Sequence, residues 1–133
     1  MQSELFKQIS GKNHQEILQW LFDNPVQVEK QYSGAYELGF QRVYFLICKT
    51  TWLVKIGSTS NIHNRIAQHC NASSVPLRFV AYMNRELRVE REIHDQFSGL
   101  RSHSEWFRAN GHLLELILQA RSDPGPTIPG IVK

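Results

Sequence analysis

Two residues in strand-like segments, Tyr44 and Lys55, have the types and the spacing of a proton-transfer pair. If residues 48–51 form a four-residue hairpin loop, Tyr44 faces Lys55 across the two strands. An ammonium group beside a phenol stabilises the phenolate and lowers the pKa of the phenol, which makes the tyrosine a general base. The alternative is that Tyr44 belongs to the core and that Lys55 extends its amino group to water.

The segment after the second strand carries groups suited to a phosphate. Gly57 permits a sharp exit and a close approach of a ligand to the backbone. Arg65 and His69 are four residues apart in a segment expected to be helical, so they project from the same side. A guanidinium suits a phosphate, and an imidazole suits proton transfer or a further phosphate contact. Taken singly, each of these residues also fits an ordinary surface position.

Glu90 and His94 repeat this four-residue spacing on a later helix. Leu87 and Phe97 belong to the same face, so Glu90 is expected to point inward, where a carboxylate needs a cation or a hydrogen-bond donor. Mg²⁺ binds proteins through one or two carboxylates together with water and substrate phosphate oxygens, so one glutamate can suffice. The alternative is an ion pair within the helix, to His94 or to an arginine.

Other reaction classes have weaker support. The sequence has no P-loop, no GxGxxG and no GxSxG motif. Five residues invite a zinc interpretation, but their spacings match no zinc finger or knuckle: His63, His69, Cys70, His94 and His103. The two cysteines, Cys48 and Cys70, form neither a disulfide framework nor a CxxC pair, which favours a reduced, cytoplasmic protein.

The charge of the chain is unevenly distributed. The 133 residues carry a formal net charge of +3, but residues 41–109 hold ten basic and five acidic side chains, a balance of +5, and residues 1–40 balance at −2. A basic, arginine-rich centre indicates an anionic partner, with nucleic acid first. No apolar run is long enough to cross a bilayer, and no signal peptide is evident at the start of the sequence.

Hydrophobic patterning predicts the elements that position these residues. The ranges 42–48, 52–57 and 77–83 are rich in β-branched and aromatic residues and are expected to be strands, the first two forming an antiparallel hairpin. Helices are expected over 61–69, over 85–100 and after Asn110, which is a candidate N-cap. The order ββαβαα predicts an α+β fold, a small three-stranded antiparallel sheet flanked by helices.

We expect three segments along the chain. Residues 1–40 form a helical N-terminal extension, in which Leu5, Phe6 and Ile9 make a short apolar stripe and Asn13 and Glu16 form a capping box. Residues 41–120 form the main domain. Residues 121–133, rich in proline and glycine, form a flexible tail.

Taken together, these positions resemble the GIY-YIG nuclease superfamily. In RVYFL, Val43 and Tyr44 stand at the I–Y positions of the first motif, and KIG, ending at Gly57, stands for YIG at the family spacing. Arg65 and Glu90 fall where the family has its helix arginine and its metal-binding glutamate, and His69 matches a histidine of many members. The stretches VKIGSTSN and VEREIHDQFSGLRSHSEWF resemble the small phage and fungal branch described as DNA-binding or meiotically up-regulated. The resemblance covers residues 41 to about 117.

The sequence departs from the family pattern at three points. Arg42 stands in place of the glycine of GIY, and Lys55 in place of the tyrosine of YIG. Lysine at the second position occurs in this branch and in some active nucleases. The late active-site asparagine of the family has no clear match, because Asn110 is equally explained as a helix cap.

The resemblance implies a metal-dependent DNA endonuclease of a bacterium or a phage-infected host, with one Mg²⁺ or Mn²⁺ held by Glu90. Tyr44, beside Lys55, would be the general base, Arg65 would stabilise the phosphate, and His69 would assist proton movement. The expected DNA-contacting residues are Arg42, Lys49, Gly57, Arg88, Arg91 and Arg101. The alternatives are a non-catalytic DNA-binding module of the same fold, and a role for residues 1–40 in binding a protein partner or in forming a homodimer.

Overall fold

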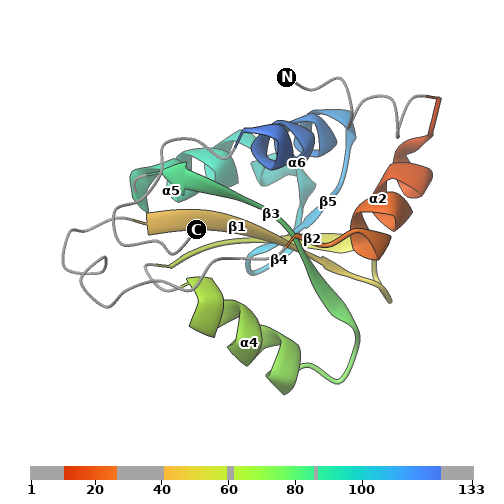
Figure 1. The fold of residues 1–133 in the computed structure, drawn as a ribbon. Coiled ribbons are helices and arrows are strands. Elements are labelled where there is room, and N and C mark those ends of the chain that lie inside the picture. Colours follow the sequence, from red (N-terminus) through yellow and green to blue (C-terminus); the bar gives the residue numbers. More distant parts are fainter. Residues whose placement is uncertain (1–10, 27–40, 60–61, 86, 124–133) are drawn as a thin grey trace.

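The computed structural model describes residues 11–26, 41–59, 62–85 and 87–123 (Figure 1). The described helices are α2 (His14–Asp23), α4 (Ile62–Ala72), α5 (Leu87–Gln96) and α6 (Gly111–Ser122), with a 3₁₀ turn η1 at Ser98–Leu100. The strands are β1 (Gln41–Cys48), β2 (Leu53–Thr59), β3 (Leu77–Arg85), β4 (Arg101–His103) and β5 (Trp106–Arg108). The apolar stripe expected near the N-terminus and residues 124–133 of the expected tail lie outside the described residues.

The fold is α+β, as predicted, but the sheet has five strands rather than three. Its order is β3-β1-β2-β5-β4, and every neighbouring pair is antiparallel. Strands β4 and β5 were missed because each spans three residues, and the side chains of β4 are all exposed, so no alternation marks it. The expected helix over 85–100 is also shorter, since α5 ends at Gln96 and η1 follows.

The expected register of the β1–β2 hairpin is wrong by two residues. Strand β1 continues through Cys48, and the backbone N–H of Trp52, which has a φ of 58°, donates to the Cys48 carbonyl at 2.8 Å. The turn is therefore displaced by one residue from the expected position. Tyr44 lies opposite Gly57, and Lys55 lies opposite Leu46.

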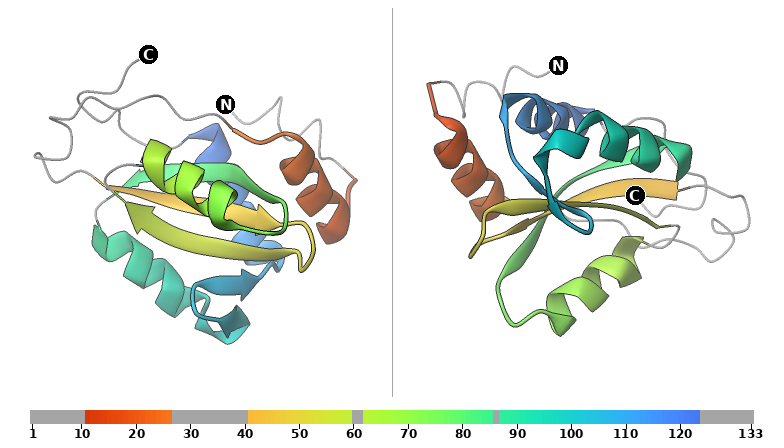
Figure 2. Two further views of the ribbon diagram at one scale, coloured as in Figure 1. Left: turned by 90° about the horizontal axis from the view of Figure 1, so that it is seen from below. Right: turned by 180° about the vertical axis from the view of Figure 1, so that it is seen from behind.

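Helices cover both faces of the sheet at β1, as Figures 1 and 2 show. On one face α2, α5 and α6 enclose the main core, to which β1 contributes Val43, Phe45 and Ile47, each fully buried. On the other face α4 packs over a smaller cluster that contains Tyr44, Leu46 and Phe79. Because both faces are covered, β1 is buried over most of its length.

Helix α2 belongs to the core of the domain. The expected capping box is present: Asn13 Oδ1 accepts from the Glu16 backbone N–H at 2.9 Å, and Glu16 Oε1 accepts from that of Asn13 at 3.0 Å. Leu18, Leu21 and Phe22 of this helix are buried in the main core. Among the described residues, no helix is both long and apolar enough for a membrane span.

We predict that Leu21→Ala destabilises the whole domain by about 2–5 kcal/mol, because it leaves a cavity in a core shared with the sheet. Leu21 is 0% exposed. The matched control is Gln15→Ala on the exposed side of α2, which is expected to change stability by less than about 0.5 kcal/mol. Denaturant unfolding of the full chain measures both, and equal stabilities would show that α2 does not contribute to the core.

Candidate active site

The candidate site lies where strand β5 stops pairing with β2. The two strands pair only over Leu53–Lys55 of β2, and one further bond joins the Ile56 N–H to the Glu105 carbonyl at 3.0 Å. Residues Gly57–Thr59 of β2 pair with β1 on the other side. At this edge, side chains of β1, β2 and α4 meet those of α5 and of the turn before β5.

The ring of Tyr44 lies across the backbone of Gly57. A Cβ atom added at Gly57 would be 2.5 Å from both Cζ and Oη of Tyr44, closer than any real contact. The glycine is therefore required by the tyrosine ring on the neighbouring strand. The Tyr44 ring fills the side of Gly57 on which a Cβ atom would lie, so packing accounts for the glycine, and its expected contact with DNA stays a prediction.

Tyr44 and His69 form a hydrogen-bonded pair. The phenol oxygen of Tyr44 is 2.9 Å from His69 Nε2, on α4, one turn after Arg65. Burial lowers the pKa of His69 from 6.5, and the positive charges of Lys55 and Arg65 lower this pKa further, against an opposite effect of Glu105. The imidazole is consequently neutral at pH 7, and its Nε2 can accept the phenol proton.

The pKa of Tyr44 moves in the direction opposite to the one expected from sequence. Burial is the main cause that raises it from 10.0 to about 12, Glu105 and Glu90 raise it as well, and Arg65 opposes them. Lys55 does not act as predicted, because it is displaced from the position opposite Tyr44. At pH 7 only roughly one part in 10⁵ of the phenol is ionised, so Tyr44 is a proton donor in the resting protein.

The ammonium group of Lys55 is paired with Glu105, a residue that the sequence interpretation missed. Lys55 Nζ lies 3.4 Å from Glu105 Oε1, with side chains 15% and 40% exposed, and 5.7 Å from the ring centre of Trp106. Glu105 follows Ser104, whose φ of 51° makes the tight turn between β4 and β5. The stretch VEREIHDQFSGLRSHSEWF, which Glu105, Trp106 and Phe107 end, was noted in the sequence, but without strand β5 nothing placed its last glutamate beside Lys55.

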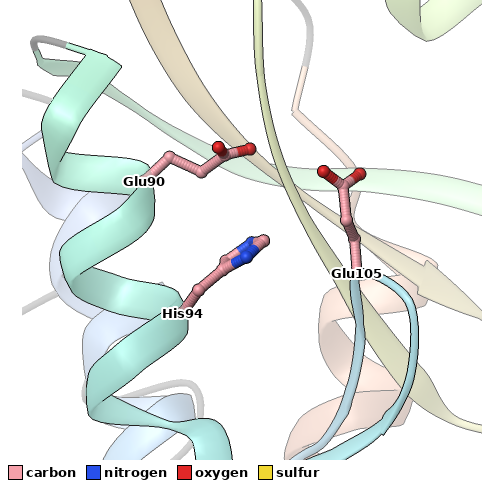
Figure 3. Close-up of side chains that lie close together, drawn as sticks. All are labelled: Glu90, His94 and Glu105. Atoms are coloured by element: carbon pink, nitrogen blue, oxygen red, sulfur yellow. The ribbon is translucent and has the colours of Figure 1, made fainter.

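Glu90, His94 and Glu105 form a three-residue cluster, drawn in Figure 3. One ligand atom of each lies within 4.8 Å of the others, and Glu90 and His94 project from α5 toward Glu105. His94 Nε2 donates to the Ile56 carbonyl at 2.8 Å, and its Nδ1 is 3.4 Å from Nη2 of Arg101. The bond to a carbonyl, which only accepts, places the ring proton on Nε2.

The donor set of this cluster fits a hard divalent cation. Two carboxylates that face each other offer the oxygen ligands that Mg²⁺ and Mn²⁺ prefer. His94 has both ring nitrogens engaged with Ile56 and Arg101, so its evident role is to fix the edge of β2 against α5. The inward position expected for Glu90 agrees with this arrangement, and Glu105 adds a second carboxylate.

The residues expected to contact DNA are dispersed. Arg42 is 2% exposed, donates from Nε to Asn84 Oδ1 at 2.8 Å and stacks on Tyr82, so this arginine is part of the packing and is removed from the DNA-contacting set. Lys49 lies at the opposite end of β1, about 16 Å along the strand from Tyr44. Arg91 and Arg101 are exposed near the cluster, whereas the side chain of Arg88 is outside the described part of the chain.

Asn110 acts as a helix cap. Its Oδ1 accepts from the Leu113 backbone N–H at 2.9 Å, at the N-terminus of α6. This bond satisfies one of the free N–H groups of the first turn, which accounts for an asparagine at this position.

The fold and the site define an α+β domain with a polar, cation-compatible cluster at one edge of its sheet. Residues 41–122 match the family model of the T5orf172 domain, which is found in phage and homing-endonuclease-like proteins. The match covers more than half of the chain, which therefore belongs to the T5orf172 domain family. Neither the curated proteins nor the solved structures contain a significant match.

We predict that Gly57→Ala breaks the Tyr44–His69 contact and destabilises the domain by about 1–3 kcal/mol, because the added Cβ displaces the buried phenol. The control is Gly99→Ala, where an added Cβ meets no atom within 4 Å. Denaturant unfolding measures both variants. In a Tyr44→Ala background, Gly57→Ala is expected to cost much less, and an unchanged cost would separate Gly57 from the ring.

Proposed function

We propose that this protein is a metal-dependent DNA endonuclease of the GIY-YIG type. The observation that carries the proposal is the convergence of the Tyr44–His69 pair, Arg65, Lys55 and Glu90 at one edge of the sheet. These five residues were selected from sequence as the candidate catalytic set. Membership in the T5orf172 domain family, with its phage and homing-endonuclease-like proteins, supports the same activity.

The hydrogen bond between Tyr44 and His69 defines a path for the proton of an attacking water. His69, neutral at pH 7, is the base, and the hydroxyl of Tyr44 is hydrogen-bonded to its Nε2 at 2.9 Å. The water gives its proton to the Tyr44 oxygen while the phenol proton passes to His69 Nε2. This route avoids a free phenolate, which the raised pKa of Tyr44 makes scarce.

The charged residues around this pair would bind the phosphate in two ways, directly through Arg65 and through a cation held by Glu90 and Glu105. Arg65 is exposed on α4 and close enough to influence the pKa values of both Tyr44 and His69, so its guanidinium is available to the phosphate being cleaved. Glu90 and Glu105 would hold the divalent cation. When bound, this cation supplies polarisation of the phosphate and neutralises charge on the leaving oxygen.

One observation favours the alternative, a DNA-binding module without catalysis. Lys55 pairs with Glu105, and Arg101 lies against His94, so cationic side chains already neutralise part of the cluster. In a module of this kind, the same cations would bind DNA phosphates and no metal would be needed.

The cleavage prediction is tested on supercoiled plasmid in Mg²⁺ or Mn²⁺. We expect nicking or linearisation by the wild-type protein and its loss in Glu90→Gln, since the amide is a poorer cation ligand. The matched control is Glu92→Gln, an exposed glutamate on the same helix, which is expected to cleave normally. EDTA is expected to abolish cleavage as well.

The control outcomes separate the two functions. Cleavage that survives in Glu90→Gln would remove this residue from the cation site. A wild-type protein that shifts DNA in a salt-sensitive manner but does not cleave it would establish the binding module.

The pH dependence of cleavage distinguishes the two possible bases. If neutral His69 is the base, kcat/KM falls tenfold per unit only below pH 6.5, because the pKa of His69 lies below that value, and is flat above it. If a Tyr44 phenolate with a pKa of about 12 were the base, kcat/KM would instead rise tenfold per unit from pH 7 into the alkaline range. Initial rates at fixed ionic strength measure the profile, and a steady alkaline rise would contradict the relay.

A further inference from the structure

A row of side chains crosses the sheet beside the candidate site. The pairings Lys55↔Trp106 and Trp106↔His103 place these three residues on one face, since residues opposite each other in a sheet point the same way. Arg108, two residues beyond Trp106 on β5, shares this face. Lys55, His103, Trp106 and Arg108 are called the β5 face below.

The helices of the described chain leave the β5 face open. In Figure 2 (left), α4 lies over β1 and β3, and no helix stands in front of β5 and β4. The neighbouring residue Phe107 points to the opposite face, where it is fully buried in the main core. Strand β5 thus places Phe107 in the main core on one face of the sheet and the aromatic and basic side chains of the β5 face on the other.

The composition of this face suits an unpaired nucleotide. Trp106 is partly exposed, His103 and Arg108 are exposed, and Lys55 Nζ lies 5.7 Å from the Trp106 ring centre. Bases stack on such rings whatever their identity, and basic side chains around the ring attract the phosphates. Bases in a duplex are stacked on each other and present only their edges, so an aromatic face is of use only for unpaired bases.

The other two tryptophans are used differently. Trp52 packs edge-on against Phe22, with ring centres 6.0 Å apart, and Trp20 lies under the guanidinium of Arg121. Both pack against the main core, on the far side of the sheet from the β5 face. Trp106 alone among the three lies next to Glu105 of the candidate site.

We propose that the β5 face binds single-stranded DNA, with a base stacked on Trp106 and the flanking phosphates held by Arg108 and His103. Since Trp106 directly follows Glu105, the stacked nucleotide is a close neighbour of the phosphate at the cation site. The preferred substrate is therefore DNA with an unpaired stretch at the cleavage point. This substrate class rests on the proposed endonuclease function, whereas the binding itself does not.

Binding is measured by fluorescence anisotropy in EDTA, so that cleavage plays no part. The probes are a labelled oligothymidylate and a hairpin duplex with the same number of phosphates. The wild-type protein is expected to bind the oligothymidylate more tightly, and Trp106→Ala to weaken that binding about tenfold, the scale of one lost stacking contact, with little effect on the duplex. Trp106→Phe, which keeps an aromatic ring, is expected to retain most of the affinity.

Intrinsic fluorescence provides a readout that a structural role would not give. Oligothymidylate is expected to quench the wild-type emission, and this quenching is expected to vanish in Trp106→Phe although Trp20 and Trp52 remain. For charge, Arg108→Ala is expected to weaken binding more than Arg78→Ala, an exposed arginine that packs on Phe22 away from this face.

The outcomes for the two proposals are separable. Equal or tighter binding of the duplex, or quenching that persists in Trp106→Phe, would overturn the β5 face as a single-strand site. Selective binding of single strands, without cleavage of either the plasmid or DNA that carries an unpaired stretch, would leave the β5 face standing and contradict the endonuclease proposal. Plasmid cleavage by a protein that binds the oligothymidylate no more tightly than the duplex would support the endonuclease proposal and contradict the β5 face as a single-strand site.

Discussion

The contact on which the site depends is the one between the Tyr44 ring and the bare backbone of Gly57. It requires that β1 and β2 pair in one register only, because a shift by two residues would bring Lys55 or Thr59 under the ring. It also requires a helix above the ring, since a buried phenol needs a hydrogen-bond partner, and α4 supplies His69. His69 is neutral because burial and the nearby cations Lys55 and Arg65 all lower the pKa of its imidazole.

The second constraint is the short length of β5. Because β5 pairs with only three residues of β2, the outer edge of β2 beyond Ile56 is accessible to side chains from the far face of the sheet. His94 of α5 reaches this edge and donates to the Ile56 carbonyl, and Glu90 lies one turn away. A longer β5 would fill the edge with ladder hydrogen bonds and would separate the carboxylates of α5 from Tyr44, Arg65 and His69.

Much of this arrangement follows from the sequence, because local patterns determine local elements. The hairpin segments, the helix that carries Arg65 and His69, and the caps at Asn13 and Asn110 were all accessible to periodicity and capping rules. The register of the hairpin could not be predicted in this way, because it depends on where the turn lies. A turn displaced by one residue moved Lys55 away from the position opposite Tyr44.

The position of Glu105 in the site and the raised pKa of Tyr44 could not be predicted from the sequence either, because each depends on contacts between segments far apart in the chain. Strands of three residues carry too little pattern to be recognised, so β5 and its preceding turn could not be placed. Without them, neither the partner of Lys55 nor the second carboxylate near Glu90 was predictable. The burial that governs Tyr44 likewise comes from the packing of α4 on the sheet.

The Lys55–Glu105 pair explains how lysine is accommodated at the position where the GIY-YIG motif, which the sequence resembles, has tyrosine. The side chain of Lys55 is only 15% exposed, and an ammonium group so far from water needs a compensating anion. Glu105 provides this anion at 3.4 Å, and the Lys55 ammonium also lies 5.7 Å from the centre of the Trp106 ring. The lysine therefore depends on Glu105, at the start of the sequence EWF, for its compensating charge. Because Glu105 also faces Glu90, the carboxylate that neutralises Lys55 is at the same time a member of the cluster with Glu90 and His94, so the lysine and the cluster share one charged group.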